Sequence, residues 1–256
     1  MAKIVAVVNQ KGGVGKTTTA VNLAAALYAQ GARVLLCDFD PQANATSGLG
    51  VEKKSLKRSV YDAIVQEIPV EQCIVRTKFG DVLPSTAALA GAGVELIGFE
   101  DREHCLKRVL EPVRDKYDYI FIDCSPSLGF TTVNILTAAD SVLIPVQCEY
   151  LALEGLSKLL NTIKIVKGNL NPDLEIEGFL LTMYMRNRLN NQVANEVREH
   201  FGPLAYDTII QRNIRLGEAP SHGKPIMLYD ASANGATNYL LLAKEFLKKN
   251  RKKSTK

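Results

Sequence analysis

Residues 9–19 read NQKGGVGKTTT, between a short apolar run at 4–8 (IVAVV) and an alanine-rich run at 20–29 (AVNLAAALYA). An apolar run, a glycine-rich turn and a helical run in this order predict a strand, a loop and a helix. Glycines let successive backbone N–H groups approach phosphate oxygens, and the helix adds the positive end of its dipole. The stretch therefore predicts a phosphate-binding loop, with one lysine more than such a loop requires.

The chemistry of this loop follows from its residue types. Lys16 is expected to place its charge on the β- and γ-phosphates, and the Thr17 hydroxyl is a candidate ligand for Mg²⁺. The strict pattern G-x-x-x-x-G-K-[ST] fails because its first position is Gln10. A chance glycine-rich turn is the alternative reading, and the strand and helix on either side argue against it. The expected nucleotide contacts of the loop are Gly12, Gly13, Val14, Gly15, Lys16, Thr17 and Thr18.

Carboxylates follow two other apolar runs. YDYIFIDCSPSLG (117–129) places Asp123 at the end of a run, as in a Walker B motif that holds Mg²⁺, and VLLCDFDPQ (34–42) supplies Asp38 and Asp40. Open α/β sheets bind ligands at the carboxyl ends of their strands, so these groups are expected beside the phosphate loop. Asp40 is placed to orient an attacking water; a turn-forming role for an aspartate before proline is the alternative. The candidate metal ligands are Thr17, Asp40 and Asp123.

The rest of the chain predicts one α/β domain. Strands are expected at 4–9, 33–40, 118–123, 141–147 and 175–183, and helices at 16–30, 99–115, 131–138, 152–167, 190–201 and 236–249. The strand runs are continuous rather than alternating, which is typical of strands buried on both faces. We therefore expect a single domain over 1–256: a mostly parallel twisted sheet with helices on both faces, of the P-loop NTPase type. The segment 51–80 reads as a surface excursion, and about 250–256 as a flexible basic tail.

Cysteines and charge narrow the class of protein. The five cysteines never form a CxxC pair, which favours buried thiols in a reducing, cytoplasmic compartment, and no run is long enough to predict a membrane helix. Residues 179–256 contain 13 Lys and Arg against 6 Asp and Glu, a balance of +7 in a chain whose net charge is +4. A positive surface late in the chain favours a polyanionic partner, either nucleic acid or an acidic membrane.

Five motifs together resemble the ParA/Soj partition ATPases, which belong to the deviant Walker A ATPases. They are KGGVGKTTT (11–19), DFDPQANATSGLG (38–50), IDCSPSLG (122–129), VQCEYLALEGL (146–156) and RNIRLGEAPSHGKPI (212–226). The resemblance covers residues 3–248. It implies that the early lysine, Lys11, contacts the nucleotide of a second subunit, so that two ATP molecules lie between two chains. A cation acting across the interface also offsets the repulsion between two polyphosphates and can stabilise the transition state.

The same resemblance implies a cycle. An ATP-bound homodimer binds DNA without sequence preference, and a ParB/Spo0J-type partner stimulates weak ATP hydrolysis, which segregates chromosomes or plasmids. Segments 40–48 and 123–129 resemble switch loops. The catalytic residues are then Lys11, Lys16 and Asp40. The DNA contacts are expected at Arg186 and Arg215, with the protein on the nucleoid, and Arg212 and Asn213 are expected on the adenine side.

Three positions depart from the family pattern, and three rival functions remain. Met185 lies where many members have a carboxylate, Gln211 replaces a frequent proline, and Ser125 stands where a second proline is common. The first rival is a MinD-like ATPase that positions cell division at a membrane; residues 240–242 and 246–247 are instead expected to pack on the core. An iron–sulfur carrier of the nitrogenase type and a DNA-binding regulator without ATP turnover are the others.

Overall fold

The computed structural model describes residues 1–126, 129–149 and 152–253 and contains a seven-stranded sheet in the order β3-β4-β2-β5-β1-β6-β7. The strands are β1 Lys3–Val7, β2 Val34–Phe39, β3 Val75–Thr77, β4 Gly80–Leu83, β5 Tyr119–Cys124, β6 Ser141–Gln147 and β7 Glu175–Thr182. Every neighbouring pair runs parallel except β3 and β4. The mostly parallel sheet predicted from the sequence is confirmed.

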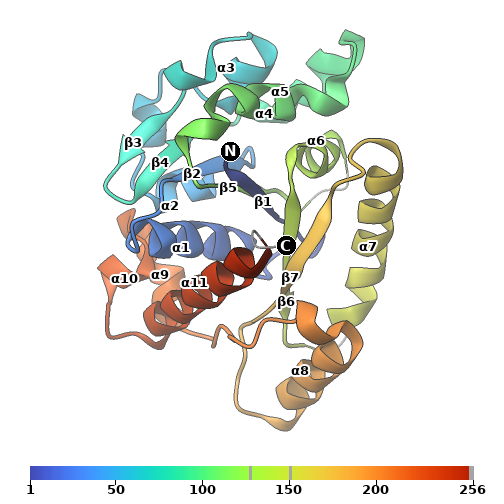
Figure 1. The fold of residues 1–256 in the computed structure, drawn as a ribbon. Helices are drawn as coiled ribbons and strands as arrows, with labels where there is room; N and C mark the ends of the chain where they lie inside the picture. Colours follow the sequence, from blue (N-terminus) through green and yellow to red (C-terminus); the bar gives the residue numbers. More distant parts are fainter. Residues whose placement is uncertain (127–128, 150–151, 254–256) are drawn as a thin grey trace.

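Helices cover both faces of this sheet (Figure 1). They are α1 Lys16–Tyr28, α2 Asn44–Gly48, α3 Val60–Val65, α4 Leu89–Glu95, α5 Cys105–Leu110, α6 Phe130–Ala138, α7 Ala152–Asn169, α8 Arg188–Phe201, α9 Ile214–Glu218, α10 Ile226–Tyr229 and α11 Asn234–Lys253. Single turns of 3₁₀-helix extend several of them. The predicted helix at 99–115 consists of α5 with 3₁₀ turns at Arg102–His104 and Glu111–Lys116.

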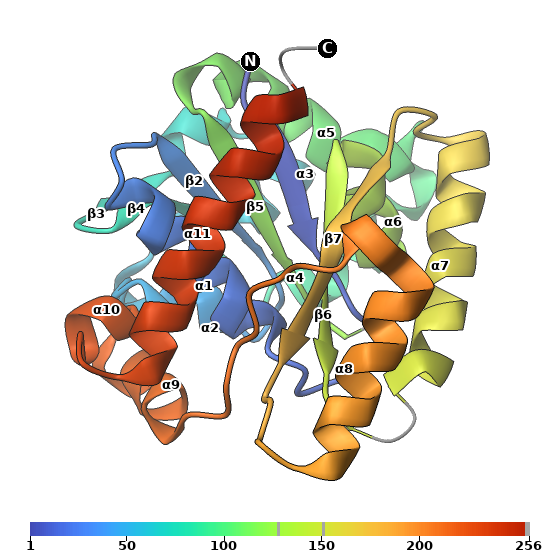
Figure 2. The ribbon, with the colours of Figure 1, turned by 60° about the horizontal axis from the view of Figure 1, so that its bottom comes forward.

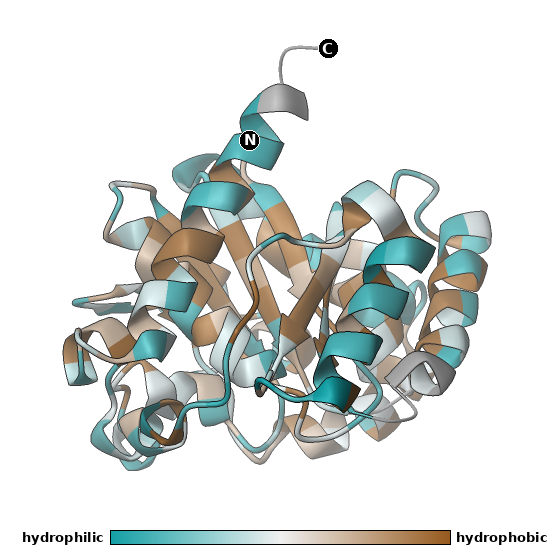
Figure 3. Ribbon diagram, turned by 90° about the horizontal axis from the view of Figure 1, so that it is seen from below, coloured by the Kyte–Doolittle hydropathy of each residue, from teal (hydrophilic) through white to brown (hydrophobic). Residues whose placement is uncertain are grey.

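Two hydrophobic cores lie on the two faces of the sheet because side chains alternate along each strand. In β1, Ile4 and Ala6 enter the core shared with α3 to α8, while Val5 and Val7 enter the core shared with α1, α2 and α9 to α11. Strands buried on both faces need apolar residues at every position, which explains their continuous apolar runs. Seen from below, the central strands are apolar and polar residues lie on the outer turns of the helices (Figure 3).

The segment 51–80 is more ordered than the sequence predicts. It contains α3 and β3 and leads into β4, so the hairpin of β3 and β4 extends the sheet beyond β2. The expectation of a surface excursion is wrong for this hairpin. Both strands are short, and a strand of three or four residues gives too little period to detect.

The carboxyl ends of the strands meet at one edge of the sheet. The arrowheads of β1, β6 and β7 point to this edge, opposite the end of the molecule where both chain termini lie (Figure 2). In the register, Asp123 of β5 lies beside Val7 of β1 on one side and beside Asp38 of β2 on the other. The sheet order therefore brings two sequence-distant carboxylates next to the loop that follows β1.

The last helix packs against the body of the protein. Tyr239, Leu242 and Phe246 of α11 are buried against α1 and the sheet. Leu240 and Leu241 remain exposed, so the expectation that they pack on the core is wrong. The helix continues through Lys253, into the predicted tail, and residues 254–256 lie outside the described residues. No helix in the part of the chain that the structure describes combines the length and apolar character needed to cross a membrane.

Candidate nucleotide-binding site

The loop between β1 and α1 has the backbone of a phosphate cradle. Gly13 and Gly15 have φ values of +74° and +87°, in the left-handed region that favours glycine. A Cβ built on Gly12 or Gly13 would have no heavy atom within 4 Å, so the space above the loop is open to a ligand. Lys16 begins α1, and its Nζ donates a hydrogen bond to the Lys11 carbonyl at 3.1 Å. The amino end of a 13-residue helix thus faces the same space as this lysine.

Two polar side chains, one at the start of the loop and one at the end of β7, hold the loop in place. Asn9 donates from Nδ2 to the Pro145 carbonyl at 2.7 Å and accepts the Lys11 N–H at Oδ1 at 3.0 Å. At the other end of the loop, the Thr182 hydroxyl donates to the Val14 carbonyl at 2.9 Å. Both are buried, where unpaired polar groups would be costly, so they fix the loop geometry in the absence of ligand.

The second lysine forms an ion pair with a residue that follows β6. The Lys11 Nζ lies 3.4 Å from Glu149 Oε2, and both side chains are about half exposed. Gln147 holds this carboxylate through a 2.6 Å hydrogen bond from Nε2 to Glu149 Oε1. Lys11 therefore lies on the rim of the site, tethered to the end of β6 and accessible from outside the molecule.

The Asp123 carboxylate is buried and lacks a hydrogen bond. Neither oxygen has a partner at hydrogen-bonding geometry among the residues that the structure describes, although the Thr17 side chain is near enough to lower the pKa, and the Asp123 side chain is fully buried. Burial raises the pKa of Asp123 well above its usual range, the charge of Asp38 adds to this, and Thr17 and Lys16 oppose it in part. A buried polar group without a partner calls for an ion or water, and a carboxylate beside a threonine hydroxyl is a donor set that Mg²⁺ accepts.

Asp38 and Asp40 differ in their surroundings. The Asp38 carboxylate is hydrogen-bonded within the protein. Its Oδ2 accepts from the Thr46 N–H and from the Thr46 hydroxyl, both at 2.7 Å. Burial raises the pKa of Asp38 to about 6, although these bonds oppose the shift. Asp40 follows the last residue of β2, and its carboxylate accepts one hydrogen bond among the described residues, from the Gln42 N–H at 2.9 Å. The structure thus pairs Asp38 within the protein and leaves Asp40 just beyond the end of β2.

A separate cavity of 230 Å³ adjoins the far end of the phosphate loop. Gly15 and Thr18 line it from the loop side, and Gln211, Arg212 and Asn213 line it from the segment before α9. The Asn213 side chain also caps α9 by accepting the Arg215 N–H at 2.8 Å. Arg212 and Asn213 thus line a cavity together with residues of the phosphate loop and the start of α1.

The expected DNA-contacting arginines are both exposed but differ in their partners. Arg186 precedes α8 and makes no ion pair with the residues that the structure covers. Arg215 of α9 is engaged by Glu218 at 2.8 Å and by Asp230 at 3.6 Å. A DNA phosphate at Arg215 would compete with two carboxylates, so Arg186 is the freer of the two.

Two of the residues that depart from the family pattern donate backbone hydrogen bonds to asparagine side chains. Met185 donates its N–H to Asn190 Oδ1 at 2.6 Å, and its side chain is exposed. Gln211 donates its N–H to Asn238 Oδ1 at 3.0 Å, a bond that the frequent proline would not make. Ser125 directly follows β5. The switch segment around it is described except for residues 127 and 128, and the 146–156 motif except for residues 150 and 151, which lie outside the described residues.

The cysteines are all buried. Cys124, next to Asp123, directs its thiol to the Val7 carbonyl at 3.2 Å, and burial raises its pKa to about 12. It is therefore held as a neutral thiol inside the sheet.

Sequence reasoning missed four supporting residues: Asn9, Thr46, Glu149 and Thr182. Asn9 and Thr182 carried a usable signal, because each is a polar residue at the end of an otherwise apolar run. Thr46 and Glu149 carried none, since their roles depend on Asp38 and Lys11, which the fold alone brings to them.

Comparisons with known proteins agree with this geometry. A family model described as an AAA domain matches residues 2–176. The chain is 58% identical to the sporulation initiation inhibitor protein Soj of Bacillus subtilis, over 96% of this chain and 98% of that protein. It is 49% identical to the chromosome partitioning protein ParA of Myxococcus xanthus, over 99% and 91% of the two chains.

A solved structure extends the likeness to three dimensions. The cobyrinic acid a,c-diamide synthase of Mycobacterium smegmatis with bound ADP and magnesium superposes with a TM-score of 0.84 at 37% identity, over 95% of this chain and 93% of that one. The chain therefore belongs to the ParA/Soj family of P-loop partition ATPases.

Proposed function

We propose that this protein forms an ATP-sandwich dimer that binds DNA without sequence preference and hydrolyses ATP when a ParB/Spo0J-type partner stimulates it. This cycle would segregate a chromosome or plasmid and place the protein on the nucleoid. The observation that carries the nucleotide part is the Asp123 carboxylate, buried without a hydrogen bond beside the phosphate loop. A structure of a similar protein holds ADP and magnesium, which supports Mg²⁺ and ATP as the ligands here.

The chain's own residues divide the work of hydrolysis. Lys16 holds the β- and γ-phosphates, together with the backbone N–H groups of the glycine loop. Thr17 and Asp123 would hold Mg²⁺, which would supply positive charge to the phosphates when bound. Asp40 orients a water for attack on the γ-phosphorus through its free oxygen, since Oδ1 is occupied by the Gln42 N–H. The bond from the γ-phosphorus to the bridging oxygen then breaks, leaving ADP and phosphate.

The position of Lys11 supports the dimer. Its side chain is tethered outside its own cradle, so it can reach a phosphate of a facing subunit by leaving Glu149. An exposed ion pair of this kind contributes on the order of 0–1 kcal/mol, so a polyphosphate can displace it. Contacts from Lys11 would then exist only in the ATP dimer and would be lost when the γ-phosphate leaves.

The proposed DNA binding is supported by membership of the family and by the positive charge late in the chain. The proposed stimulation by a ParB/Spo0J-type partner is supported by membership of the family. The positive balance of residues 179–256 and the exposed Arg186 supply phosphate contacts, and a dimer doubles them. The MinD-like alternative gains no support from α11, because Leu242 and Phe246 of that helix are already buried in the core.

The test compares wild type with Lys11→Ala by gel filtration and DNA binding, with ATP, ADP or no nucleotide. Exposed Lys164→Ala on α7 is the matched control. ATP alone should dimerise wild type and the control, DNA binding should follow the dimer, and Lys11→Ala should stay monomeric while still binding nucleotide. Normal dimerisation and DNA binding by Lys11→Ala would refute the role in trans.

A second measurement tests catalysis. Phosphate release should rise when DNA and a peptide from the amino-terminal part of a ParB/Spo0J-type protein are added together, and Asp40→Ala should abolish this rise. Stimulation that survives in Asp40→Ala would remove Asp40 from the mechanism.

A further inference from the structure

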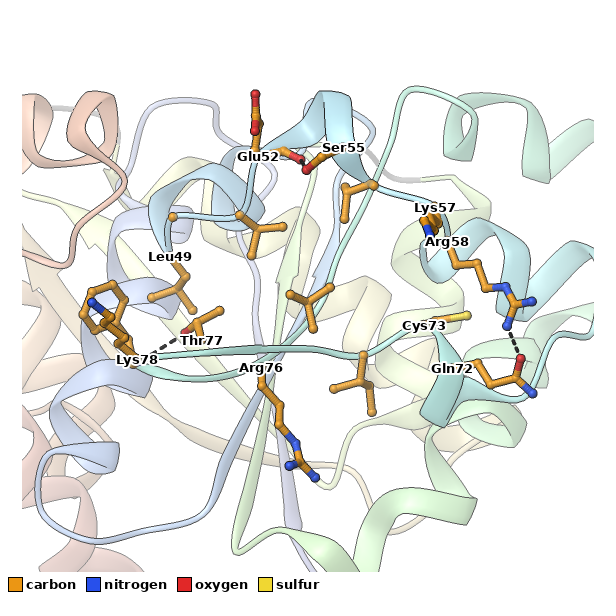
Figure 4. Close-up of a pocket in the computed structure, with 16 residues that line it drawn as sticks. Leu49, Glu52, Ser55, Lys57, Arg58, Gln72, Cys73, Arg76, Thr77 and Lys78 are labelled. Carbon is orange, nitrogen blue, oxygen red and sulfur yellow. Dashed lines mark hydrogen bonds between the residues drawn. The ribbon is translucent and has the colours of Figure 1, made fainter.

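A cavity of 720 Å³ lies at the β3 end of the sheet and shares no lining residue with the nucleotide site. Two stretches line it, one within residues 49–58 and the other within residues 72–79. Figure 4 shows Glu52 and Ser55 on one side of this space and Cys73 and Thr77 on the other. The residues between α2 and α3 thus face the hairpin that extends the sheet.

The second wall of this cavity runs along an unpaired strand edge. β3 is the first strand of the sheet and pairs only with β4. Successive side chains of a strand point to opposite faces of the sheet, so a cavity over one face would be lined by every second residue. Here six consecutive residues, 74 to 79, line the cavity. The cavity therefore follows the edge of β3. No backbone hydrogen bond joins residues 75–78 to the facing segment 49–58, so edge N–H and C=O groups of β3 are left to a further strand.

Apolar side chains form the interior of the groove and cations form its rim. Leu49, Val51 and Leu56 line it from one wall, and Val75 and Phe79 from the other. All five are buried or half-buried.

Two cations at the rim have no carboxylate partner. Lys57 and Lys78 are exposed and form no ion pair with any residue described here, whereas Arg76 lies opposite Asp81 of β4 in the strand register. Arg58 is held by Gln72 across the mouth (Figure 4), and Glu52 is the one acidic residue in the lining. The rim is therefore complementary to a ligand with negative charge.

We propose that this groove binds an extended acidic segment of a partner protein, which adds a strand to the free edge of β3. Main-chain hydrogen bonds to the strand edge would give affinity, and alternate side chains would enter the apolar interior. A DNA backbone offers phosphates to the rim but no apolar groups to the interior. The bound segment would lie near the residues that follow Asp40, because Lys53, between the lining residues Glu52 and Ser55, donates from Nζ to the Gln42 carbonyl at 2.6 Å.

The test uses fluorescence anisotropy with a labelled ten-residue peptide that alternates glutamate with valine. Lys57→Glu/Lys78→Glu is the groove variant, and Lys158→Glu/Lys164→Glu on exposed positions of α7 carries the same change in charge as a control. Two further peptides have lysine in place of glutamate, or N-methyl groups on alternate amides that remove strand hydrogen bonds.

Saturable binding of the acidic peptide should weaken at least tenfold in the groove variant and stay within twofold in the control. The lysine peptide should not bind, and N-methylation should weaken binding at least tenfold. Equal binding to both variants, or equal binding of the N-methylated peptide, would overturn the proposal. So would loss of DNA binding in the groove variant without saturable peptide binding, which would make this surface a nucleic-acid contact.

Discussion

Replacing Glu177 with glutamine should destabilise the protein without touching the nucleotide site. Glu177 is a buried carboxylate in β7 that ties together three strands and the last helix. Its Oε2 lies 2.5 Å from Lys3 Nζ and accepts the Ser141 hydroxyl at 2.9 Å, while Oε1 accepts Asn250 Nδ2 at 2.9 Å. Lys3 and Ser141 are the first residues of β1 and β6, so the cluster lies at the edge of the sheet opposite Lys16.

The magnitude follows from the burial of the two charges. The Glu177 side chain is 1% exposed and that of Lys3 is 23% exposed. Removing one member of a buried ion pair costs about 3–5 kcal/mol, and the partial exposure of Lys3 favours the lower end, about 3 kcal/mol. For a chain of this size that corresponds to a fall in Tm of roughly 6–12 °C. Nucleotide affinity should stay unchanged.

The assay is urea and thermal unfolding at pH 7.5 without nucleotide. Glu71→Gln is the control, because Glu71 pairs with Lys116 at 3.2 Å on the surface and its loss should cost less than about 1 kcal/mol. Lys3→Met added to Glu177→Gln should restore part of the stability, since it removes the orphaned charge. A Glu177→Gln variant as stable as the control, or a double variant less stable than Glu177→Gln, would refute this reasoning.

The stability difference between wild type and Glu177→Gln should depend on pH. Burial alone raises the pKa of Glu177, but the charge of Lys3 and the hydrogen bonds outweigh it, so the net pKa is lowered. A carboxyl group with a lowered folded pKa stabilises the protein above its unfolded pKa of about 4.3 and loses this contribution as the pH falls through the folded value. The difference between wild type and Glu177→Gln should be constant from pH 8 to 5 and shrink below about pH 4.

Three further predictions concern the site. Glu149→Gln releases Lys11 from an exposed ion pair, so ATP-dependent dimerisation should occur at about two- to fivefold lower protein concentration in sedimentation velocity, and a shift to higher concentration would contradict the tether. Thr182→Val removes the hydrogen bond to Val14, so nucleotide affinity measured by calorimetry should fall roughly five- to twentyfold with only a small change in Tm; unchanged affinity would exclude a role in positioning the loop. Because burial raises the pKa of Asp38 to about 6, its contribution to stability is fully present below the unfolded pKa of about 3.9 and is lost as the pH rises from there through 6. Asp38→Asn should therefore remove about 1.4 kcal/mol of the difference in unfolding free energy between pH 5 and pH 7.5, and an unaltered pH profile would contradict the buried position.

Much of the candidate site follows from local sequence. The apolar run, the glycines, Lys16 and Thr17 are contiguous, so strand, loop and helix amino end can be predicted together. Asp123 is found in the same way, because a carboxylate at the end of a buried parallel strand lies at the ligand-binding edge of the sheet. Lys11 is different, because the residue types alone do not predict its role. The resemblance to a family implies that it contacts the nucleotide of a second subunit.

The remainder depended on contacts between residues far apart in the chain. The β3 and β4 hairpin escaped prediction because its strands are too short to show a period, and Gly80 and Lys78 interrupt the apolar pattern. The short helices α2, α9 and α10 are likewise below the length at which a 3.6-residue period is detectable.

By itself, the sequence determined the parallel α/β class, the phosphate loop and the place of the Asp123 carboxylate at the end of a strand, because each depends on neighbours within about ten residues. Only the tertiary structure decided that Asp38 lies beside Asp123, that Lys11 is tethered to Glu149 and that Arg212 adjoins the phosphate loop. The physical reason is that the order of the strands in the sheet determines which of these residues become neighbours. Strands separated by tens of residues become neighbours at 4.7–4.9 Å spacing, and no local pattern records which strands they will be.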